Sequence, residues 1–536
     1  MSGRGGRQAK GPLRRLWADE RGNVTLITAG GMMMMLFAVG FGIDYARAEM
    51  FQTKLNAAAD AAVLVAVDPA EANASDAQAQ LDAQKMFDGQ AAQLAGQGVA
   101  VVSRSVSAQT TSQLNSAGVT QLIRTASVTY SATVNTLFSR VLGANTLTVS
   151  GTTSSSSTRP PNINFYVLLD ASPSMLLPSS SSGLSNIYSA TSCDFACHEQ
   201  LPHNDGIYVR DNSGRDVFLN SNYYGTGTGA GTYYFINPGT KGLYNASGTQ
   251  IGYNAAVSGT TLSYTPLGSY TTSTIPGYYA DGYWLTHNYG KIYSGQSAIE
   301  LRVSDETTAA QDLIPFATSQ ASAYQVTYQL QFFAFNWTHQ GQSSPVTAYG
   351  TMTNVANLTS SAVPNIDSTQ DYWYTNNCPS SSYCINDQGS EFYNMFTAMN
   401  TIMPAPGTGA SSSSPQETLM LITDGMSDEN YGSGRTHSPL TQTILDQCTA
   451  IKTRGIRIAI LYTQYLPDSL AGDSWSQSNV LPYLSPTDQD AVALKSCASA
   501  NSDGSPLFYQ VTTGQSISSA LQALFAMSLK TAHLTN

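Results

Sequence analysis

The chain has 536 residues, more than one hydrophobic core usually supports, so two or more domains are expected. Only 11% of its residues are charged, against roughly a quarter in an average protein. Neutral polar residues must therefore cover much of the surface, which favours an exported protein. The net charge of −11 argues against a nucleic-acid-binding function, because such a protein needs a basic surface to replace phosphate counterions.

The N-terminus combines a basic segment with an apolar one. Six of the 24 Lys and Arg residues precede Asn23, and an uncharged stretch from Asn23 to Ile43 is long enough to cross a hydrocarbon core of about 30 Å. The positive-inside rule keeps residues 1–22 in the cytoplasm and exports the rest. A cleaved signal peptide is the alternative, but the apolar run exceeds a typical signal-peptide core and no clear A-x-A cleavage site follows it. We therefore expect a transmembrane helix at 23–43, anchored in a bacterial inner membrane, with the bulk of the chain periplasmic.

Residues 44–153 carry the pattern of a small α/β module. Helical spacing of apolar and Ala positions continues the anchor helix through Ala66, and a second helix is predicted from about Ala74 to Ala95. Alternating stretches then predict strands at 99–107, 119–134 and 146–153. The Ser run and Arg-Pro-Pro that follow predict a linker at 154–161.

Residues 162–536 alternate apolar runs with helical patterns. The first run, INFYVLLD, is nearly unbroken, as in a strand buried on both faces. Further strands are predicted at 324–335, 418–423, 456–463 and 507–511, and helices at 298–320, 391–403, 439–454, 488–500 and 516–530. This alternation predicts an α/β fold with a doubly wound, Rossmann-like parallel sheet that binds ligands at the carboxyl ends of its strands.

Segment 176–294 interrupts that alternation. It holds fifteen of the thirty tyrosines of the chain, and its tyrosine pairs are separated by Gly, Asn-Pro-Gly and Thr runs. This alternation of tyrosine pairs with turn-forming residues is typical of short strands joined by tight turns, and a structureless loop of this length is uncommon in a compact domain. We expect a β-rich insertion.

Two predicted strands end in carboxylates. Asp170, Ser172 and Ser174 form a D-x-S-x-S loop after the first strand, and Asp424 follows the strand at 418–423. Both should lie on one sheet edge, where carboxylate and hydroxyl oxygens suit a hard divalent cation such as Mg²⁺. The structural alternative is a helix cap and turn, in which Asp and Ser are favoured without an ion.

The D-x-S-x-S loop and the later T-D-G resemble the metal-ion-dependent adhesion site of von Willebrand factor A domains. The resemblance implies a C-terminal domain of that fold, which binds Mg²⁺, or Mn²⁺ or Ca²⁺, and leaves one coordination position for an acidic group of a partner protein. It also implies a third loop with a Thr, for which Ser390 is the counterpart here and Thr408 the competitor. The predicted ligands are therefore Asp170, Ser172, Ser174, Ser390 and Asp424.

The first 150 residues resemble the TadE/TadG-like module of Tad (Flp-type) pilus-assembly proteins. The resemblance rests on ERGNVTLITAG, the apolar helix and DYARAEMFQTKLNAAADAAVLVA, in that order, and on SVTYSATVNTLFSRVLGANTLTVSGTT downstream. TadG-like members combine this module with an A-type domain. Pilin-like members that are processed carry Glu five residues after the cleavage-site Gly, but Ile27 holds that position after Gly22. The departure predicts a permanent anchor.

All six cysteines follow the membrane segment, as expected in an oxidising compartment. Sequence alone permits fifteen pairings; pairing of neighbours, our expectation, joins Cys193 with Cys197, Cys378 with Cys384, and Cys448 with Cys497. The C-x₃-C-H around Cys193 has one residue too many for c-type haem attachment. Zinc at His198 and His203, or Ca²⁺ at Asp205, Asp211 and Asp216, are further alternatives to disulfides and solvated turns.

No nucleophile paired with a base is evident, so we expect a binding protein and neither an enzyme nor a receptor for small molecules. The resemblances imply pilus-assembly or pilin proteins as partners of the metal face. The alternative is a surface adhesin whose Tyr-rich insertion contacts external surfaces while the metal site is structural.

Overall fold

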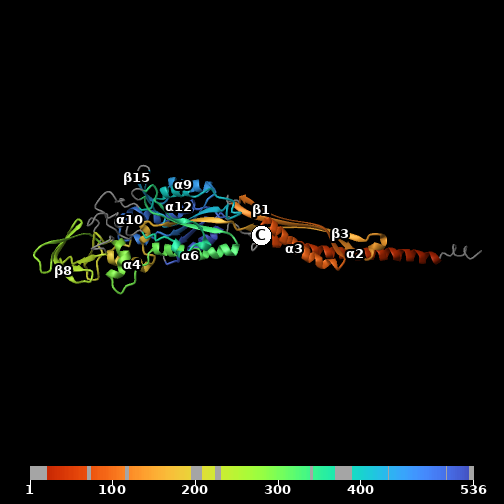
Figure 1. Cartoon of the computed structure of the whole chain (residues 1–536), viewed down its shortest axis with the longest axis horizontal. Coiled ribbons are helices and arrows are strands. Elements are labelled where there is room, and N and C mark those ends of the chain that lie inside the picture. Colours follow the sequence, from red (N-terminus) through yellow and green to blue (C-terminus); the bar gives the residue numbers. More distant parts are fainter. Residues whose placement is uncertain are drawn as a thin grey trace, which may run out of the picture. The chain divides into compact units, whose positions relative to one another are not determined.

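The computed structural model describes residues 21–68, 74–114, 120–194, 208–223, 231–338, 342–367, 389–431, 434–501, 504–512 and 514–529. The chain divides into two compact units. One contains Met1–Thr111 and Ile123–Arg159, and the other contains Ser112–Leu122 and Pro160–Asn536. The result is a mixed α/β protein with several separate sheets (Figure 1).

The first unit is built on one long helix, α2 (Arg21–Val67), which runs without a break because no proline interrupts it. Its amino-terminal half exposes apolar side chains, and it is the one helix of the described chain long and apolar enough to cross a membrane. This agrees with a single-pass anchor. The second half packs its buried face, including Phe51, Leu55 and Ala59, in the core of the unit.

A second helix and a three-stranded sheet complete this unit. Helix α3 (Asp76–Ala95) packs along α2, and the sheet has the order β1 (Val99–Leu114), β2 (Thr120–Asn135), β3 (Thr146–Arg159). The expected linker at 154–161 is wrong in its first part, because the Ser run lies inside β3. Serine side chains alternate there between half-buried and exposed positions, so composition alone does not reveal the strand.

The second unit contains a six-stranded sheet with the order β12-β11-β4-β13-β16-β17. All neighbours are parallel except β12, which pairs antiparallel at one edge. Numbered along the chain within this sheet, the order is 3-2-1-4-5-6, the order of the doubly wound α/β class. The strands are β4 (Ile163–Asp170), β11 (Tyr328–Phe335), β12 (Val346–Asn354), β13 (Gln416–Thr423), β16 (Arg457–Thr463) and β17 (Phe508–Val511).

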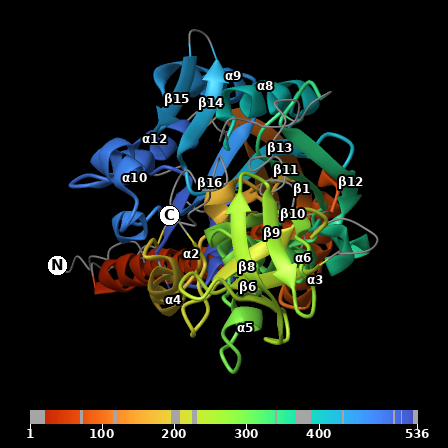
Figure 2. The ribbon, with the colours of Figure 1, turned by 90° about the vertical axis from the view of Figure 1, so that its left-hand side faces the viewer.

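Helices cover both faces of this sheet, and each face has its own hydrophobic core (Figures 1 and 2). One face carries α6 (Arg302–Tyr324) and α13 (Ile517–Leu529), whose inward side chains include Leu313 and Phe525. The other carries α8 (Phe392–Ile402), α9 (Gln442–Thr453) and α12 (Gln489–Cys497). The central strands are buried along their whole length, as their unbroken apolar sequences predict.

Between β4 and α6 the chain forms a closed six-stranded barrel with the order β10-β5-β6-β7-β8-β9 (Figure 2). Two helices, α4 and α5, flank it in sequence. The barrel accounts for the tyrosine-rich segment, in which aromatic side chains line two small cores. The elements are α4 (Ser181–Thr191), β5 (Asp216–Asn220), β6 (Tyr233–Ile236), β7 (Leu243–Asn245), β8 (Gln250–Ser258), β9 (Thr261–Pro266), β10 (Ser273–Tyr279) and α5 (Gly282–Ile292).

Short elements fill the remaining connections. A hairpin of β14 (Ser427–Tyr431) and β15 (Gly434–Ser438) follows the end of β13. The others are η2 (Ser139–Leu142), η3 (Pro173–Leu176), η4 (Val355–Asn357), η5 (Ser360–Ala362), η6 (Pro467–Leu470), α10 (Ser474–Asn479) and α11 (Leu481–Leu484).

Candidate functional site

The carboxyl edge of the large sheet holds the candidate site. β11, the next strand of this sheet along the chain, lies on one side of β4, and β13 lies on the other, so the strand order reverses between β4 and β13. Open α/β sheets bind ligands at such a point, outside the carboxyl ends. Asp170 is the last residue of β4, and Asp424 directly follows β13. The two carboxylates are thus brought to the same edge, as the sequence predicts.

Asp170 is fully buried and held by its neighbours. One carboxylate oxygen accepts the Ser172 N–H at 2.9 Å, and the other accepts the Thr423 hydroxyl at 2.6 Å. Burial raises the pKa of Asp170 to about 6, although the bonds from Ser172 and Thr423 act in the opposite direction. The carboxylate is therefore fixed in orientation but incompletely compensated in charge.

Asp424 is also fully buried, and neither of its carboxylate oxygens has a hydrogen-bond partner in the described structure. Burial, followed by the charge of Asp170, raises its pKa to about 7. The Ser174 hydroxyl is near enough to lower that pKa, though it forms no hydrogen bond of normal geometry, and Arg302 lowers it further. A buried carboxylate without partners is costly, so these two oxygens are the clearest sign of a missing ligand.

The two serine hydroxyls of the D-x-S-x-S loop lie close to each other. Ser172 is buried and Ser174 is partly exposed, and their hydroxyl oxygens are 3.0 Å apart. The segment before α8 packs against Pro173 of this loop, since a Cβ built on Gly389 would lie 3.2 Å from Cδ of Pro173. Ser390, the next residue, is buried.

The competing residue, Thr408, lies elsewhere. Its carbonyl accepts the side chain of Gln416 at 3.3 Å, and the neighbouring Gly409 carbonyl accepts the N–H of Asn162 at 2.8 Å. Gln416 begins β13 and Asn162 precedes β4, so Thr408 sits at the amino edge of the sheet. The structure therefore separates Thr408 from Asp170 and Asp424, and places Ser390 beside their loop.

Two further buried carboxyl groups surround the site, and the sequence patterns did not identify them. Glu306 of α6 accepts the N–H of Asp170 at 3.0 Å, and its other oxygen has no partner. Asp490 of α12 is buried with both oxygens unpaired, and its Cβ would lie 3.3 Å from a Cβ built on Gly425. Burial raises the pKa of both groups well above its usual range. The sequence patterns of α6 and α12 do not reveal these two carboxyl groups, because both project inward from helices that cover the sheet.

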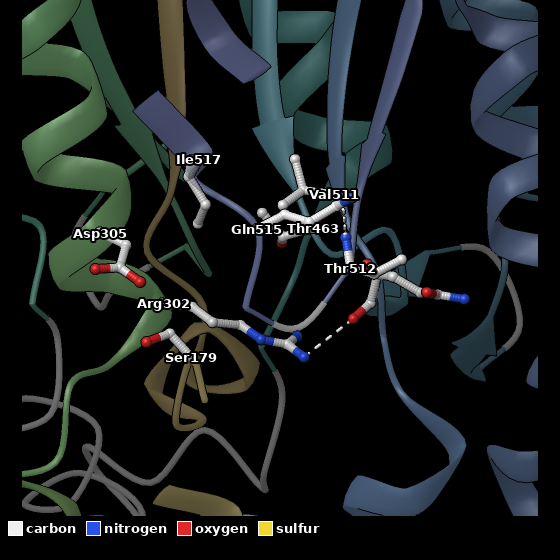
Figure 3. Close-up of a pocket in the computed structure, with 9 residues that line it drawn as sticks. Ser179, Arg302, Asp305, Thr463, Val511, Thr512, Gln515 and Ile517 are labelled. Carbon is white, nitrogen blue, oxygen red and sulfur yellow. Dashed lines mark hydrogen bonds between the residues drawn. The ribbon is translucent and has the colours of Figure 1, made fainter. Parts of the chain in front are cut away.

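Arg302 is a buried cation whose charge acts on Asp424. It begins α6, where its Nη2 donates to the Gln464 carbonyl at 3.0 Å while Nη1 has no partner among the described residues. Figure 3 shows it beside a cavity of about 20 Å³ at the ends of β16 and β17. The cavity is lined by Ser179, Arg302, Asp305, Thr463, Gln464, Val511, Thr512, Gln515 and Ile517. One guanidinium cannot balance four carboxyl groups.

The donors present fit a hard cation. Two carboxylates and hydroxyl groups are the oxygen ligands that Mg²⁺ prefers, usually with several waters. A cluster of three or more His, Cys, Asp or Glu side chains able to hold a metal is absent from the described part of the chain. A cation here would accordingly depend on Asp170, Asp424 and the serine hydroxyls.

The other metal candidates find different roles or fall outside the described ranges. Asp211 accepts backbone N–H groups and pairs with Arg215 at 2.6 Å, and Asp216 pairs with Arg210 at 2.9 Å. Those carboxylates are compensated by arginine and not left for Ca²⁺. Asp205, His198 and His203 lie outside the described residues.

One expected disulfide is present: Cys448 of α9 bonds to Cys497 of α12. It joins two helices on the same face of the sheet. Cys193 is also disulfide-bonded. Cys197, Cys378 and Cys384 lie outside the described residues.

Comparison with known protein families finds a match in the amino-terminal part of the chain. Residues 22–79 match the family described as putative Flp pilus-assembly TadE/G-like. This match covers the anchor helix and the start of α3, and it supports a role in pilus assembly.

No curated protein matches the chain. Among solved structures, the crystal structure of the pilus adhesin SpaC from Lactobacillus rhamnosus GG is similar with 9% identity and a TM-score of 0.28. The alignment covers 79% of this chain and 34% of that one, so the chain spans about a third of its length.

Proposed function

We propose that the chain is a membrane-anchored, TadG-like component of Tad pilus assembly. Its second unit would be a von Willebrand factor A-like domain that binds a protein partner through a divalent cation. The anchor would lie in the inner membrane with the exported units in the periplasm. The family match at residues 22–79 supports the assembly role, and the strand order with its polar carboxyl edge supports the domain type.

The unpaired oxygens of Asp424 are the observation that carries the metal proposal. Two buried carboxylates repel each other, and the charge of Asp170 raises the pKa of Asp424. A divalent cation removes this repulsion and supplies the missing partners. Asp170, Asp424, Ser172, Ser174 and Ser390 would hold it.

The remaining side chains fit a binding site better than a catalytic one. Ser174, the partly exposed hydroxyl of the loop, marks the side from which a partner approaches. A bound cation would offer that partner a coordination position suited to an acidic side chain. Thr423 and Ser172 keep the Asp170 carboxylate in one orientation, which preorganises the site for the ion.

The proposal is tested by calorimetric titration of the full chain in detergent with Mg²⁺ and Mn²⁺. Asp170→Asn and Asp424→Asn preserve side-chain shape while removing a buried charge, so both variants should fold. We expect binding by the wild type and its loss in both variants. Glu417→Gln, a buried carboxyl at the amino end of β13, is the matched control and should bind as the wild type does.

A second readout separates the metal from the assembly role. Deletion of the protein should abolish pili, and expression of the wild type should restore them. Restoration of pili by Asp424→Asn would show that assembly does not use the ion, while the proposed role in pilus assembly would stand. Normal piliation in the deletion strain would contradict the assembly role itself.

A surface adhesin is the second candidate function, favoured by apolar side chains exposed on the barrel. Tyr270 is fully exposed and Leu267 is exposed in the β9–β10 connection, and exposed Tyr253 of β8 donates its hydroxyl to the Ser269 carbonyl there. Protease treatment of intact cells distinguishes the two candidates. Cleavage of the barrel would favour display outside the cell, whereas protection until the outer envelope is opened would favour assembly.

A further inference from the structure

The connection between β2 and β3 is an apolar turn on the surface of the first unit. We infer that this turn, residues 137–142 with the sequence Leu-Phe-Ser-Arg-Val-Leu, is a second membrane contact that enters the lipid interface beside the anchor helix. The inference rests on the proposed membrane anchor. It adds a part of the exported module to the lipid-contacting surface.

The turn exposes apolar side chains that a water-facing loop would not carry. Val141 is 71% exposed and Leu142 is 65% exposed, and about half of Leu137 and Phe138 is exposed as well. Four exposed apolar side chains thus fall within six residues, and exposed apolar patches mark interaction sites. The one charged residue, Arg140, has a long side chain whose head can reach lipid phosphates.

The turn is fixed to the anchor helix by a specific set of hydrogen bonds. Asp44 of α2 accepts the N–H groups of Leu137, Phe138 and Ser139 at 2.7, 2.9 and 2.7 Å, and the Ser139 hydroxyl at 2.8 Å. Close packing adds to this, because a Cβ built on Gly40 would lie 2.7 Å from Cβ of Phe138. The backbone of the turn is thus held against one turn of the helix.

The position of that helical turn along α2 sets how deep residues 137–142 lie relative to the membrane. The uncharged stretch from Val24 to Ile43 is about 30 Å long at 1.5 Å per residue, close to the thickness of a hydrocarbon core. Gly40 lies in its last turn and Asp44 just beyond it. Tyr45, exposed next to Asp44, is the kind of aromatic residue found at membrane interfaces.

Lipid is the occupant that these observations favour. The turn packs beside Gly40 of α2, and Phe41 and Ile43 of the same helix are exposed as well. Interfacial apolar segments enter the boundary of headgroups and acyl chains by about 5–10 Å, and the turn packs beside Gly40, in the last turn of the uncharged stretch. A second contact would also restrict rotation of the module around its anchor.

The test uses the full chain in liposomes with single added cysteines that carry an NBD fluorophore. Val141→Cys and Leu142→Cys report on the turn, and Met34→Cys, at a helix position 76% exposed, reports on the anchor. Leu81→Cys is the matched apolar control. Leu81 is 44% exposed in the first turns of α3. The start of α3 is held to the carboxyl end of β1, because Asp76 accepts the Thr110 N–H at 2.8 Å. Wild type treated with the same reagent gives the background.

Each labelled site is challenged with nitroxide-labelled lipid and with aqueous iodide. We expect lipid quenching and a blue-shifted emission at 141, 142 and 34, with iodide quenching at 81 alone. Iodide quenching at 141 and 142 combined with lipid quenching at 34 would overturn the inference and leave the anchor intact. Iodide quenching at all four sites would contradict the anchor itself. Shielding of 141 and 142 from both quenchers would overturn the inference in favour of a protein surface.

Discussion

Glu417 is a buried carboxyl group on β13, away from the candidate metal site. Its Oε1 accepts the Asn164 side chain at 3.1 Å, but Oε2 has no hydrogen-bond partner. Burial raises the pKa of Glu417 from 4.5 to about 7, although the nearby Tyr166 hydroxyl and the hydrogen bond from Asn164 lower it. The folded state therefore holds a proton that the unfolded state releases at lower pH.

The sign of this shift gives a pH prediction. Between pH 4.5 and about 7 only the folded state binds the proton, so the free energy of unfolding should fall as pH rises through that range. Glu417→Gln should remove this part of the pH dependence and stabilise the second unit at pH 8 by about 2 kcal/mol. Urea unfolding at pH 5 and pH 8 measures the difference. Equal pH slopes for wild type and variant would show that Glu417 ionises normally.

Ser390 and Thr408 provide a matched pair for the third loop of the proposed metal site. Ser390→Ala should weaken Mg²⁺ binding about tenfold, or roughly 1.4 kcal/mol, because one hydroxyl ligand is lost. Thr408→Ala should leave the dissociation constant unchanged, since Thr408 lies at the amino edge of the sheet. Calorimetric titration compares the two. A larger effect at Thr408 would contradict the placement of the site.

Asp170 and Asp424 could be predicted from sequence because apolar strands end directly in them, and parallel strands bring such residues to one edge. Glu306 and Asp490 could not, because a carboxylate on an amphipathic helix usually faces water. Only packing shows that these two project inward.

At the level of elements, unbroken apolar runs predicted the buried strands β4, β13 and β16 well. The edge strand β12 was missed because its side chains are mostly half-buried or exposed and its sequence is polar. Barrel closure was not predictable either, since it depends on pairing β10 with β5 across the whole segment. Local sequence sets the tendency to form a strand, and long-range pairing decides its partner.

Close contact between β3 and α2 depends on Gly151. A Cβ there would lie 2.4 Å from Oδ1 of Asn56 and 2.8 Å from Cε1 of Tyr130. Gly151→Ala should destabilise the first unit by about 1–3 kcal/mol, because the neighbouring side chains must shift. Gly89→Ala is the control: no atom lies within 4 Å of its added Cβ, and alanine should stabilise helix α3 by about 0.5–1 kcal/mol. Thermal unfolding followed by circular dichroism measures both, and destabilisation by Gly89→Ala would contradict the contact argument.

At the level of the whole molecule, the chain contains two units with separate hydrophobic cores. The apolar helix and the family match at residues 22–79 belong to the first. The large sheet, its helices and the barrel belong to the second. A change confined to one core should therefore affect one unit.

Calorimetric unfolding should show this as two transitions. Replacing Cys448 and Cys497 with alanine keeps their buried positions apolar and removes a crosslink between residues 49 apart. The second unit should lose about 4 kcal/mol by the loop-entropy relation, which lowers its transition. Gly151→Ala should lower only the other transition. Equal movement of both transitions in either variant would mean that the units unfold together.

The points where the barrel segment leaves and rejoins the part of the second unit built on the large sheet lie side by side. Pro178 and Leu301 form an antiparallel bridge, in which Arg302 N–H donates to the Leu177 carbonyl and Ser179 N–H to the Glu300 carbonyl. The chain passes this bridge once on the way to the barrel strands and once on the way back, so the bridge holds the two ends of the segment together. The inserted segment could in that sense be exchanged as one piece. Evolution or protein engineering could replace the barrel strands with another insertion while the path of the chain through the large sheet stays the same.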